Sequence, residues 1–591
     1  MTRPNVCRAR AAALLLAMGV ALAADAAGIR FCPQPRMRVR GFWGEKLDLL
    51  ERNWMPECAR RLDRGFVGFR RNLAEAMMLA LERHPDRRDF ADRVEAHVRQ
   101  EVAAQHPDGY VGRYTPHFTD FTKHELYGQG YYIETAVRHM DFTRGRDRRY
   151  FDAALRLADF LDGTFGPPPK RTWTDGHPGV EKALLTLADA VDRHDGPGRG
   201  RRYAELARYF VRHQHDTPEL RHRYCQSDVP ATEMKDALGH AVRATYFYAG
   251  MAGAAGRCGD GELAAAARRL VESAIDRKGY LTGGVGANWG GEAFGWDYDL
   301  SNGRGYLEGC AACGMYDWMT EMARMDGPGR YEDVRERLMH NLLLGVFNAD
   351  FTAFAYPNPT ASAEPRYAWH TLPCCVGNVP RVLEDYKNRM WAVSEAGDRL
   401  YLLHFIASTG GEATVRGVRV ALALETDYPA NGRMRLTVSA ERPVTFPLVV
   451  RHPNRAESAL YAAVPKVECG YREQTVELTA ANALRAEIAF ELPMPLQRVT
   501  CDKRVKANHG LVAWQQGPIV YAWEPAATNA VKGAPLERVP YHLRLNRGVP
   551  SRVWIPKDGK DPGETPAVKK WTCGVPVDGA GRKVENARLF R

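Results

Sequence analysis

The chain has 591 residues, which is long for one hydrophobic core, because single cores stop growing beyond roughly 250–300 residues. Apolar residues make up 45% of it, which excludes a generally disordered protein. The formal net charge is +11, but lysine and arginine are scattered among aspartate and glutamate, which argues against a nucleic-acid partner. We therefore expect two or three globular domains.

Residues 1–27 have the pattern of a secretory signal peptide. Arg3, Arg8 and Arg10 precede an apolar run over 11–20, and small residues follow at 21–26. The run is shorter than the roughly 20 residues that span a bilayer, which disfavours a membrane anchor. We therefore expect a periplasmic or secreted protein with no membrane partner after signal cleavage.

From about residue 36 to 400, apolar residues recur at three- and four-residue spacing between Gly, Pro and Asp. The pattern predicts about a dozen helices with short connectors. No fixed period of 30–45 residues is present, which disfavours a helical solenoid. Repeated helical hairpins of this number predict an (α/α)6 barrel catalytic domain over 28–398, with its loops collected at one mouth.

After about residue 396 the apolar segments become short and often alternate with polar residues, separated by Gly, Pro and Asn. They predict an antiparallel β-sandwich over 399–524. The remainder, 525–591, is rich in Pro, Gly and Lys and predicts a small C-terminal β region, partly loose. The expected fold class is thus multidomain α plus β.

The cysteines indicate a metal centre. Glu308 and Cys310 lie two residues apart at the start of an apolar, helix-like run, and the pair Cys374-Cys375 follows about sixty residues later. Thiolate and carboxylate together are a reasonable zinc set. Two alternatives stay open on spacing alone: an all-cysteine site in which Cys313 replaces Glu308, and ordinary buried thiols.

The same region suggests glycosidase chemistry. A retaining glycosidase needs a nucleophile and a general acid/base about 5–5.5 Å apart. Zinc-bound Cys374 could attack the sugar while Glu292 protonates the departing oxygen and later activates water. Glu292 follows two glycines and precedes Ala293-Phe294, so we expect apolar surroundings that raise the pKa of its carboxyl.

Three histidines stand at predicted helix starts, namely His124, His177 and His240. Neutral imidazoles suit sugar hydroxyls, which both donate and accept hydrogen bonds. Each one alone is more often a capping or core histidine. The three are candidate substrate-binding residues, beside the catalytic pair.

Many blocks of this chain resemble glycoside hydrolase family 127, whose best-known members are β-L-arabinofuranosidases, and they occur in the family's order. They include His124-Glu125-Leu126-Tyr127, Gly176-His177-Pro178, Gly239-His240-Ala241, Gly291-Glu292-Ala293-Phe294, Glu308-Gly309-Cys310, Cys374-Cys375 and Gln516-Gly517-Pro518.

The resemblance implies an (α/α)6 barrel, β-sandwich domains, and zinc held by one glutamate and three cysteines. Position by position, the ligands become Glu308, Cys310, Cys374 and Cys375, with Cys374 also the nucleophile and Glu292 the acid/base. The family's histidines near the site contact the sugar, which implies a substrate-binding role for His124, His177 and His240. Cys313 has no counterpart ligand, which disfavours the all-cysteine alternative.

Two departures concern the substrate. Cys374-Cys375 continues as Val376-Gly377-Asn378, where members typically have Pro-Pro-Asn. Asn358-Pro359 continues as Thr360-Ala361, which lacks the family's Leu-Glu carboxylate. The sugar could therefore be another unusual one from pectin.

The sequence thus predicts an exported, zinc-dependent, retaining exo-glycosidase that acts on an oligosaccharide or glycoside of plant cell walls. Two alternatives from other classes are a catalytically silent carbohydrate-binding protein with a structural zinc, and a polysaccharide lyase on a similar toroid. The sequence is compatible with a homodimer but does not define the oligomeric state.

Overall fold

The structure is a computed structural model. It describes residues 28–62, 70–114, 116–118, 124–172, 174–362, 374–453, 458–524, 537–540 and 551–557. The predicted signal peptide and most of the predicted C-terminal region lie outside these residues. Within them, no helix is long and apolar enough to cross a membrane.

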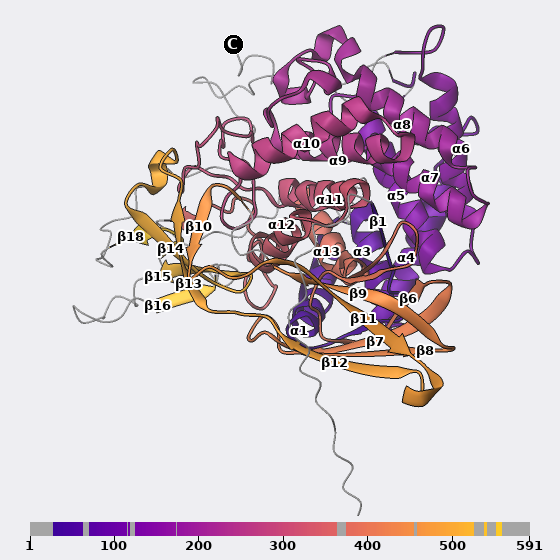
Figure 1. Ribbon diagram of the computed structural model, residues 1–591. Coiled ribbons are helices and arrows are strands. Elements are labelled where there is room, and N and C mark those ends of the chain that lie inside the picture. Colours follow the sequence, from indigo (N-terminus) through magenta and orange to yellow (C-terminus); the bar gives the residue numbers. More distant parts are fainter. Residues whose placement is uncertain are drawn as a thin grey trace, which may run out of the picture.

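The N-terminal two thirds of the chain are mainly helical (Figure 1). The α-helices are α1 Gly41–Leu49, α2 Met55–Leu62, α3 Arg70–Arg83, α4 Arg88–Ala103, α5 Glu125–Phe142, α6 Arg149–Thr164, α7 Val180–His194, α8 Arg201–His213, α9 Ala241–Cys258, α10 Gly261–Asp276, α11 Gly309–Asp326, α12 Tyr331–Leu338 and α13 Cys374–Asp385.

Six of these helices form a closed inner ring. In the order α3, α5, α7, α9, α11 and α13 each packs against the next, and α13 packs back against α3. Small residues permit this close approach: a Cβ added at Gly250 of α9 would lie 2.7 Å from the Cβ of Glu181 on α7. α9 and α11 are buried on nearly every side, as expected of inner helices. Ring closure is what the predicted barrel requires.

The strands form three sheets, with these bounds: β1 Ile29–Phe31, β2 Arg38–Val39, β3 Ala361–Ser362, β4 Trp391–Ser394, β5 Leu400–Leu402, β6 Ser408–Val415, β7 Val418–Thr426, β8 Arg433–Ala440, β9 Val444–His452, β10 Tyr461–Val464, β11 Gly470–Leu478, β12 Arg485–Glu491, β13 Leu496–Cys501, β14 Leu511–Gln516, β15 Ile519–Glu524, β16 Glu537–Pro540, β17 Ser551–Arg552 and β18 Ile555–Pro556.

The first sheet has the order β1-β4-β5-β9-β11 and the second β12-β8-β7-β6-β2. The third runs β10-β13-β14-β15-β17-β3, with β16 beside β15 and β18 beside β14. In β7, Val418, Val420, Leu422 and Leu424 are buried and alternate with more exposed residues, as the sequence pattern indicates. The predicted α plus β fold class is therefore confirmed.

The strand pairing differs from a simple split of the chain. β1 and β2, from the N-terminal region, pair with β4 and β6, so the predicted barrel segment contributes to the sheets. β10 and β13–β15 belong to the third sheet, so the predicted sandwich segment 399–524 is shared among all three sheets. The bounds of the four predicted segments stay predictions.

The sheets and the helices are joined by buried charge. Arg451 of β9 lies 2.6 Å from Asp333 and 2.8 Å from Glu336, both on α12, and its side chain is almost fully buried.

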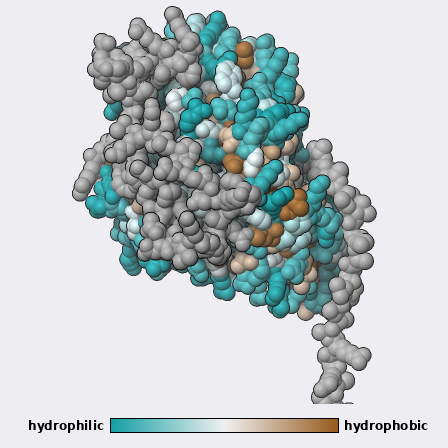
Figure 2. Space-filling model, turned by 90° about the vertical axis from the view of Figure 1, so that its left-hand side faces the viewer, coloured by the Kyte–Doolittle hydropathy of each residue, from teal (hydrophilic) through white to brown (hydrophobic). Residues whose placement is uncertain are grey.

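On the side that carries β10, β14 and β18, the coloured surface is mostly hydrophilic, with only small brown patches (Figure 2).

Candidate active site

The predicted site residues lie where inner helices begin. His240 is the N-cap of α9 and Glu308 the N-cap of α11, and Cys374 is the first residue of α13. His124 directly precedes α5, and His177 lies three residues before α7. The start of a helix carries partial positive charge, which stabilises carboxylates and thiolates. One end of the ring is thus suited to anionic side chains.

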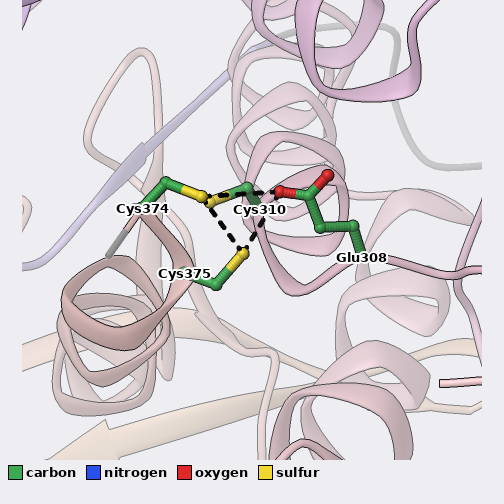
Figure 3. Close-up of side chains that lie close together, drawn as sticks. All are labelled: Glu308, Cys310, Cys374 and Cys375. Atoms are coloured by element: carbon green, nitrogen blue, oxygen red, sulfur yellow. Dashed lines mark hydrogen bonds between the residues drawn. The ribbon is translucent and has the colours of Figure 1, made fainter. Parts of the chain in front are cut away.

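Three thiols and a carboxylate meet there (Figure 3). Cys374 and Cys375 come from the first turn of α13, while Glu308 and Cys310 come from the start of α11. The sulfurs of Cys374 and Cys375 are 3.7 Å apart, and Oε1 of Glu308 lies 3.8 Å and 3.2 Å from them. One ligand atom from each of the four residues lies within 4.8 Å of the others.

These residues fit a tetrahedral metal ion. An ion about 2.3 Å from each sulfur separates two sulfurs by about 3.8 Å, close to the spacing found. Oε2 of Glu308 is buried without a hydrogen-bond partner. Burial, together with the Cys374 thiol, raises the pKa of Glu308 well above its usual value, and burial raises that of Cys375. A cation would offset the cost of ionising these groups.

Cys313 does not join the group, although it is buried one helical turn beyond Cys310. Burial raises the pKa of its thiol well above the usual range. The geometry therefore favours the carboxylate and three thiols over the all-cysteine alternative. Cys58 is also buried, and its thiol donates to the carbonyl of Val376 at 3.5 Å.

Asn378 contacts the sulfur of Cys310 and is itself held by neighbouring side chains. Its Nδ2 lies 2.7 Å from the Tyr246 hydroxyl and 3.6 Å from the sulfur of Cys310. Its Oδ1 accepts from Nε of Arg381 at 3.0 Å, which fixes the orientation of the amide. Groups that hydrogen-bond to metal ligands in this way orient them.

Glu292 lies on a tightly fixed loop beside this cluster. The loop is pinned to the start of α9, because Ala241 N donates to Glu292 O and Phe294 N donates to Gly239 O, both at 2.9 Å. Glu292 adopts a left-handed φ of 51°, as do His124 and Leu307, at φ 55° and 44°. Such strained residues cluster at functional sites.

The Glu292 carboxylate accepts two hydrogen bonds. The Tyr356 hydroxyl donates to Oε1 at 2.6 Å, and Nε2 of His240 lies 3.2 Å from Oε2. Arg243 N donates to Nδ1 of His240, so the imidazole proton sits on Nε2 and points at Glu292.

These bonds reverse one expectation. Burial raises the pKa of Glu292, as predicted, but the bonds donated by His240 and Tyr356 outweigh burial, and the net pKa is lowered. The predicted net rise is therefore wrong. Burial lowers the pKa of His240, which keeps the imidazole neutral.

The other two predicted histidines, His177 and His124, lie in a row that begins at His240. The rings of His177 and His240 are 6.3 Å apart, and those of His124 and His177 are 5.5 Å apart. Asp175 holds both, because its Oδ1 lies 3.2 Å from Nδ1 of His124 and accepts from the backbone N of His177 at 3.0 Å. The structure thus brings all the predicted site residues together, while their roles stay predictions.

Sequence reasoning did not select Tyr356, Asn378 or Asp175. Asp175 had a usable signal, because a carboxylate two residues before His177 in a Gly-containing loop is suited to hold it. Asn378 lies four residues from Cys374 on one helix face. Tyr356 had no local signal.

Comparisons with known proteins identify relatives of this chain. Residues 51–388, more than half of the chain, match the family model described as β-L-arabinofuranosidase, GH127 catalytic domain. Residues 496–556 match the glycoside hydrolase family 127 C-terminal domain. The non-reducing end β-L-arabinofuranosidase of Bifidobacterium longum subsp. longum is 28% identical over 503 residues, which are 76% of this chain and 73% of that protein.

Solved structures are similar as well. A GH127 β-L-arabinofuranosidase from Geobacillus stearothermophilus T6 has a TM-score of 0.76 at 25% identity, over 88% of this chain and 99% of that one. The GH127 β-arabinofuranosidase BT3674 has a TM-score of 0.77 at 25% identity, over 90% and 98%. The chain therefore belongs to glycoside hydrolase family 127.

Proposed function

We propose that this glycoside hydrolase is a zinc-dependent, retaining exo-enzyme that releases terminal β-L-arabinofuranose from plant cell-wall glycans. The observation that carries the proposal is the meeting of two groups: a Glu308–Cys310–Cys374–Cys375 cluster, and Glu292, which has a ligand atom within 4.8 Å of Glu308. The substrate follows the relatives, two of which are β-L-arabinofuranosidases by name.

Cys374 is the best placed of the three thiols to attack a sugar. It is partly exposed, whereas Cys310 and Cys375 are fully buried. Zinc held by Glu308 and the three cysteines would keep the thiols ionised at neutral pH. The helix start at Cys374 adds to the stabilisation of its thiolate.

The reaction then needs two displacements at the anomeric carbon. In the first, Sγ of Cys374 forms a bond to this carbon as the bond to the leaving oxygen breaks, and Glu292 gives that oxygen its proton. In the second, Glu292 takes a proton from water, the water oxygen attacks the same carbon, and the carbon–sulfur bond breaks. Two inversions retain the configuration.

The surrounding residues position Glu292 and the sugar. His240 and Tyr356 hold the two oxygens of Glu292, so its carboxylate is well suited to the second displacement. For the first displacement the carboxyl must gain a proton; burial favours this proton, but the bonds from His240 and Tyr356 oppose it and lower the net pKa. His124 and His177, fixed by Asp175, face the same site and suit sugar hydroxyls.

A substrate panel tests the proposal. Nitrophenyl β-L-arabinofuranoside, its α-anomer and nitrophenyl galacturonide are assayed with wild type, Cys374→Ser and the matched control Cys313→Ser, before and after chelation. We expect hydrolysis of the β-L-arabinofuranoside alone, abolished by chelation and by Cys374→Ser and kept by Cys313→Ser. Full activity of Cys374→Ser would overturn the thiolate mechanism. Preference for the galacturonide would overturn the proposed sugar and indicate galacturonic acid in place of arabinofuranose.

One observation favours keeping a second sugar in the panel. Thr360 and Ala361 carry no carboxylate that could bind a sugar hydroxyl. Thr360 donates to Oδ1 of Asn302 at 2.7 Å, and Ala361 begins β3.

We also propose export to the periplasm or the medium. Cell fractionation tests this, because a protein found only in the cytoplasm would contradict it.

A further inference from the structure

Trp296 is unusually exposed for its size. Its exposed fraction is 68%, the highest among the large apolar side chains in the described part of the chain. A single exposed apolar residue is common and means little by itself. The position of Trp296 relative to Glu292 gives its exposure significance.

Trp296 and Glu292 share one loop, four residues apart, so their Cα atoms are at most about 14 Å from each other. The loop is fixed on both sides of Trp296. Phe294 N donates to Gly239 O at 2.9 Å, and Tyr298 N donates to Arg277 O at 2.8 Å. The backbone that carries Trp296 is therefore held near the acid/base group.

A second segment reaches the same place. The Arg223 guanidinium lies 5.6 Å from the centre of the Trp296 ring. The ring of the next residue, Tyr224, lies 5.1 Å from that of His240, which contacts Glu292. Arg223 and Trp296 thus sit at the outer end of contacts that lead to the acid/base group. With Arg223 at the ring and 68% of the side chain open, the indole can accept a further partner.

This pair suits a sugar. The C–H face of a sugar ring packs on an indole face, and a guanidinium donates to hydroxyl or carboxylate oxygens. An exo-acting site encloses the terminal sugar, so the rest of the glycan must leave through the mouth. We infer that Trp296 and Arg223 bind the sugar on the leaving-group side of the scissile bond. This inference rests on the proposed function.

Paired substrates test it. kcat/KM is measured for a β-L-arabinofuranosyl disaccharide and for the methyl β-L-arabinofuranoside, which lacks a leaving-group sugar. We expect Trp296→Ala to lower the value about tenfold or more for the disaccharide and less than about twofold for the methyl glycoside. Trp296→Tyr should restore most of the loss, and Val464→Ala, at an exposed position of β10, should change neither value. Equal losses on both substrates, or none, would overturn the inference.

A binding measurement separates this inference from the proposed function. Calorimetric titration of Glu292→Gln with the disaccharide and with arabinose needs no turnover. We expect the added Trp296→Ala change to weaken binding of the disaccharide and to leave binding of arabinose unchanged. If wild type hydrolyses neither glycoside, the proposed function fails. A selective loss of disaccharide affinity would still support binding of the second sugar at Trp296. Unchanged disaccharide affinity would refute it.

Discussion

Replacing Tyr356 with phenylalanine tests how a hydrogen bond controls the pKa of Glu292. The change removes a hydroxyl that donates to Oε1 of Glu292 at 2.6 Å. A hydrogen bond to a charged group is worth about 1.5–3 kcal/mol, or about 10- to 150-fold. The bond favours the carboxylate over the acid, so its loss raises the pKa of Glu292. Below the raised pKa, fewer molecules carry ionised Glu292, so we expect kcat to fall by up to this factor there if the second displacement limits the rate.

The pH dependence of kcat/KM gives the sharper readout. The first displacement needs protonated Glu292, so activity is lost as pH rises through its pKa. Tyr356→Phe should therefore move the alkaline limb of the profile to higher pH. The Tyr356 hydroxyl also contacts Glu308, so the zinc content of the variant is measured alongside.

Tyr316→Phe is the matched control, because the Tyr316 hydroxyl is buried without a hydrogen-bond partner. It should leave the profile unchanged. An alkaline limb that stays in place in Tyr356→Phe, at full zinc content, would refute the reasoning about Glu292.

Two further predictions concern the metal and the fold. Cys375→Ser should purify with less than one zinc per chain by elemental analysis, whereas Cys313→Ser keeps it; full zinc in Cys375→Ser would contradict the ligand assignment. Asp385, buried at the end of α13, accepts from Arg138 and Arg389, each at 3.0 Å. Burial opposes its ionisation, but these arginines lower its pKa from 3.8 to about 2. The lowered pKa contributes about 2 kcal/mol of stability above pH 3.8, which is lost as pH falls toward 2. The stability deficit of Asp385→Asn in denaturant titrations should therefore shrink on acidification, and a constant deficit would count against the pairing.

Much of the fold could be predicted from local patterns. Inner helices such as α9 are rich in Ala and Gly, and β7 alternates apolar and polar residues. The N-terminal strands could not be predicted this way. β1 has three residues, and Ile29 pairs with Ser394, so its partner lies hundreds of positions along the chain. Its strand conformation depends on tertiary pairing, which a local window does not contain.

The site shows the same division. Glu308, Cys310 and the Cys374-Cys375 pair could be selected because few other residue types bind zinc. The direction of the Glu292 pKa could not be predicted, because its apolar sequence neighbours favour a rise while the deciding donors lie 52 and 64 residues away. Resemblance to a family supplies roles for matching residues, but not the balance between burial and hydrogen bonding.

The central claim is that Cys374 forms a bond to the sugar and that Glu292 is needed to break it. Glu292→Gln with a nitrophenyl β-L-arabinofuranoside tests this directly, because nitrophenol leaves without a proton whereas water needs a base. We predict a burst of nitrophenol and, by peptide mass spectrometry, one anhydropentose attached to Cys374. A Glu292→Gln protein that releases the burst but carries the sugar on another residue, or on none, would contradict the account.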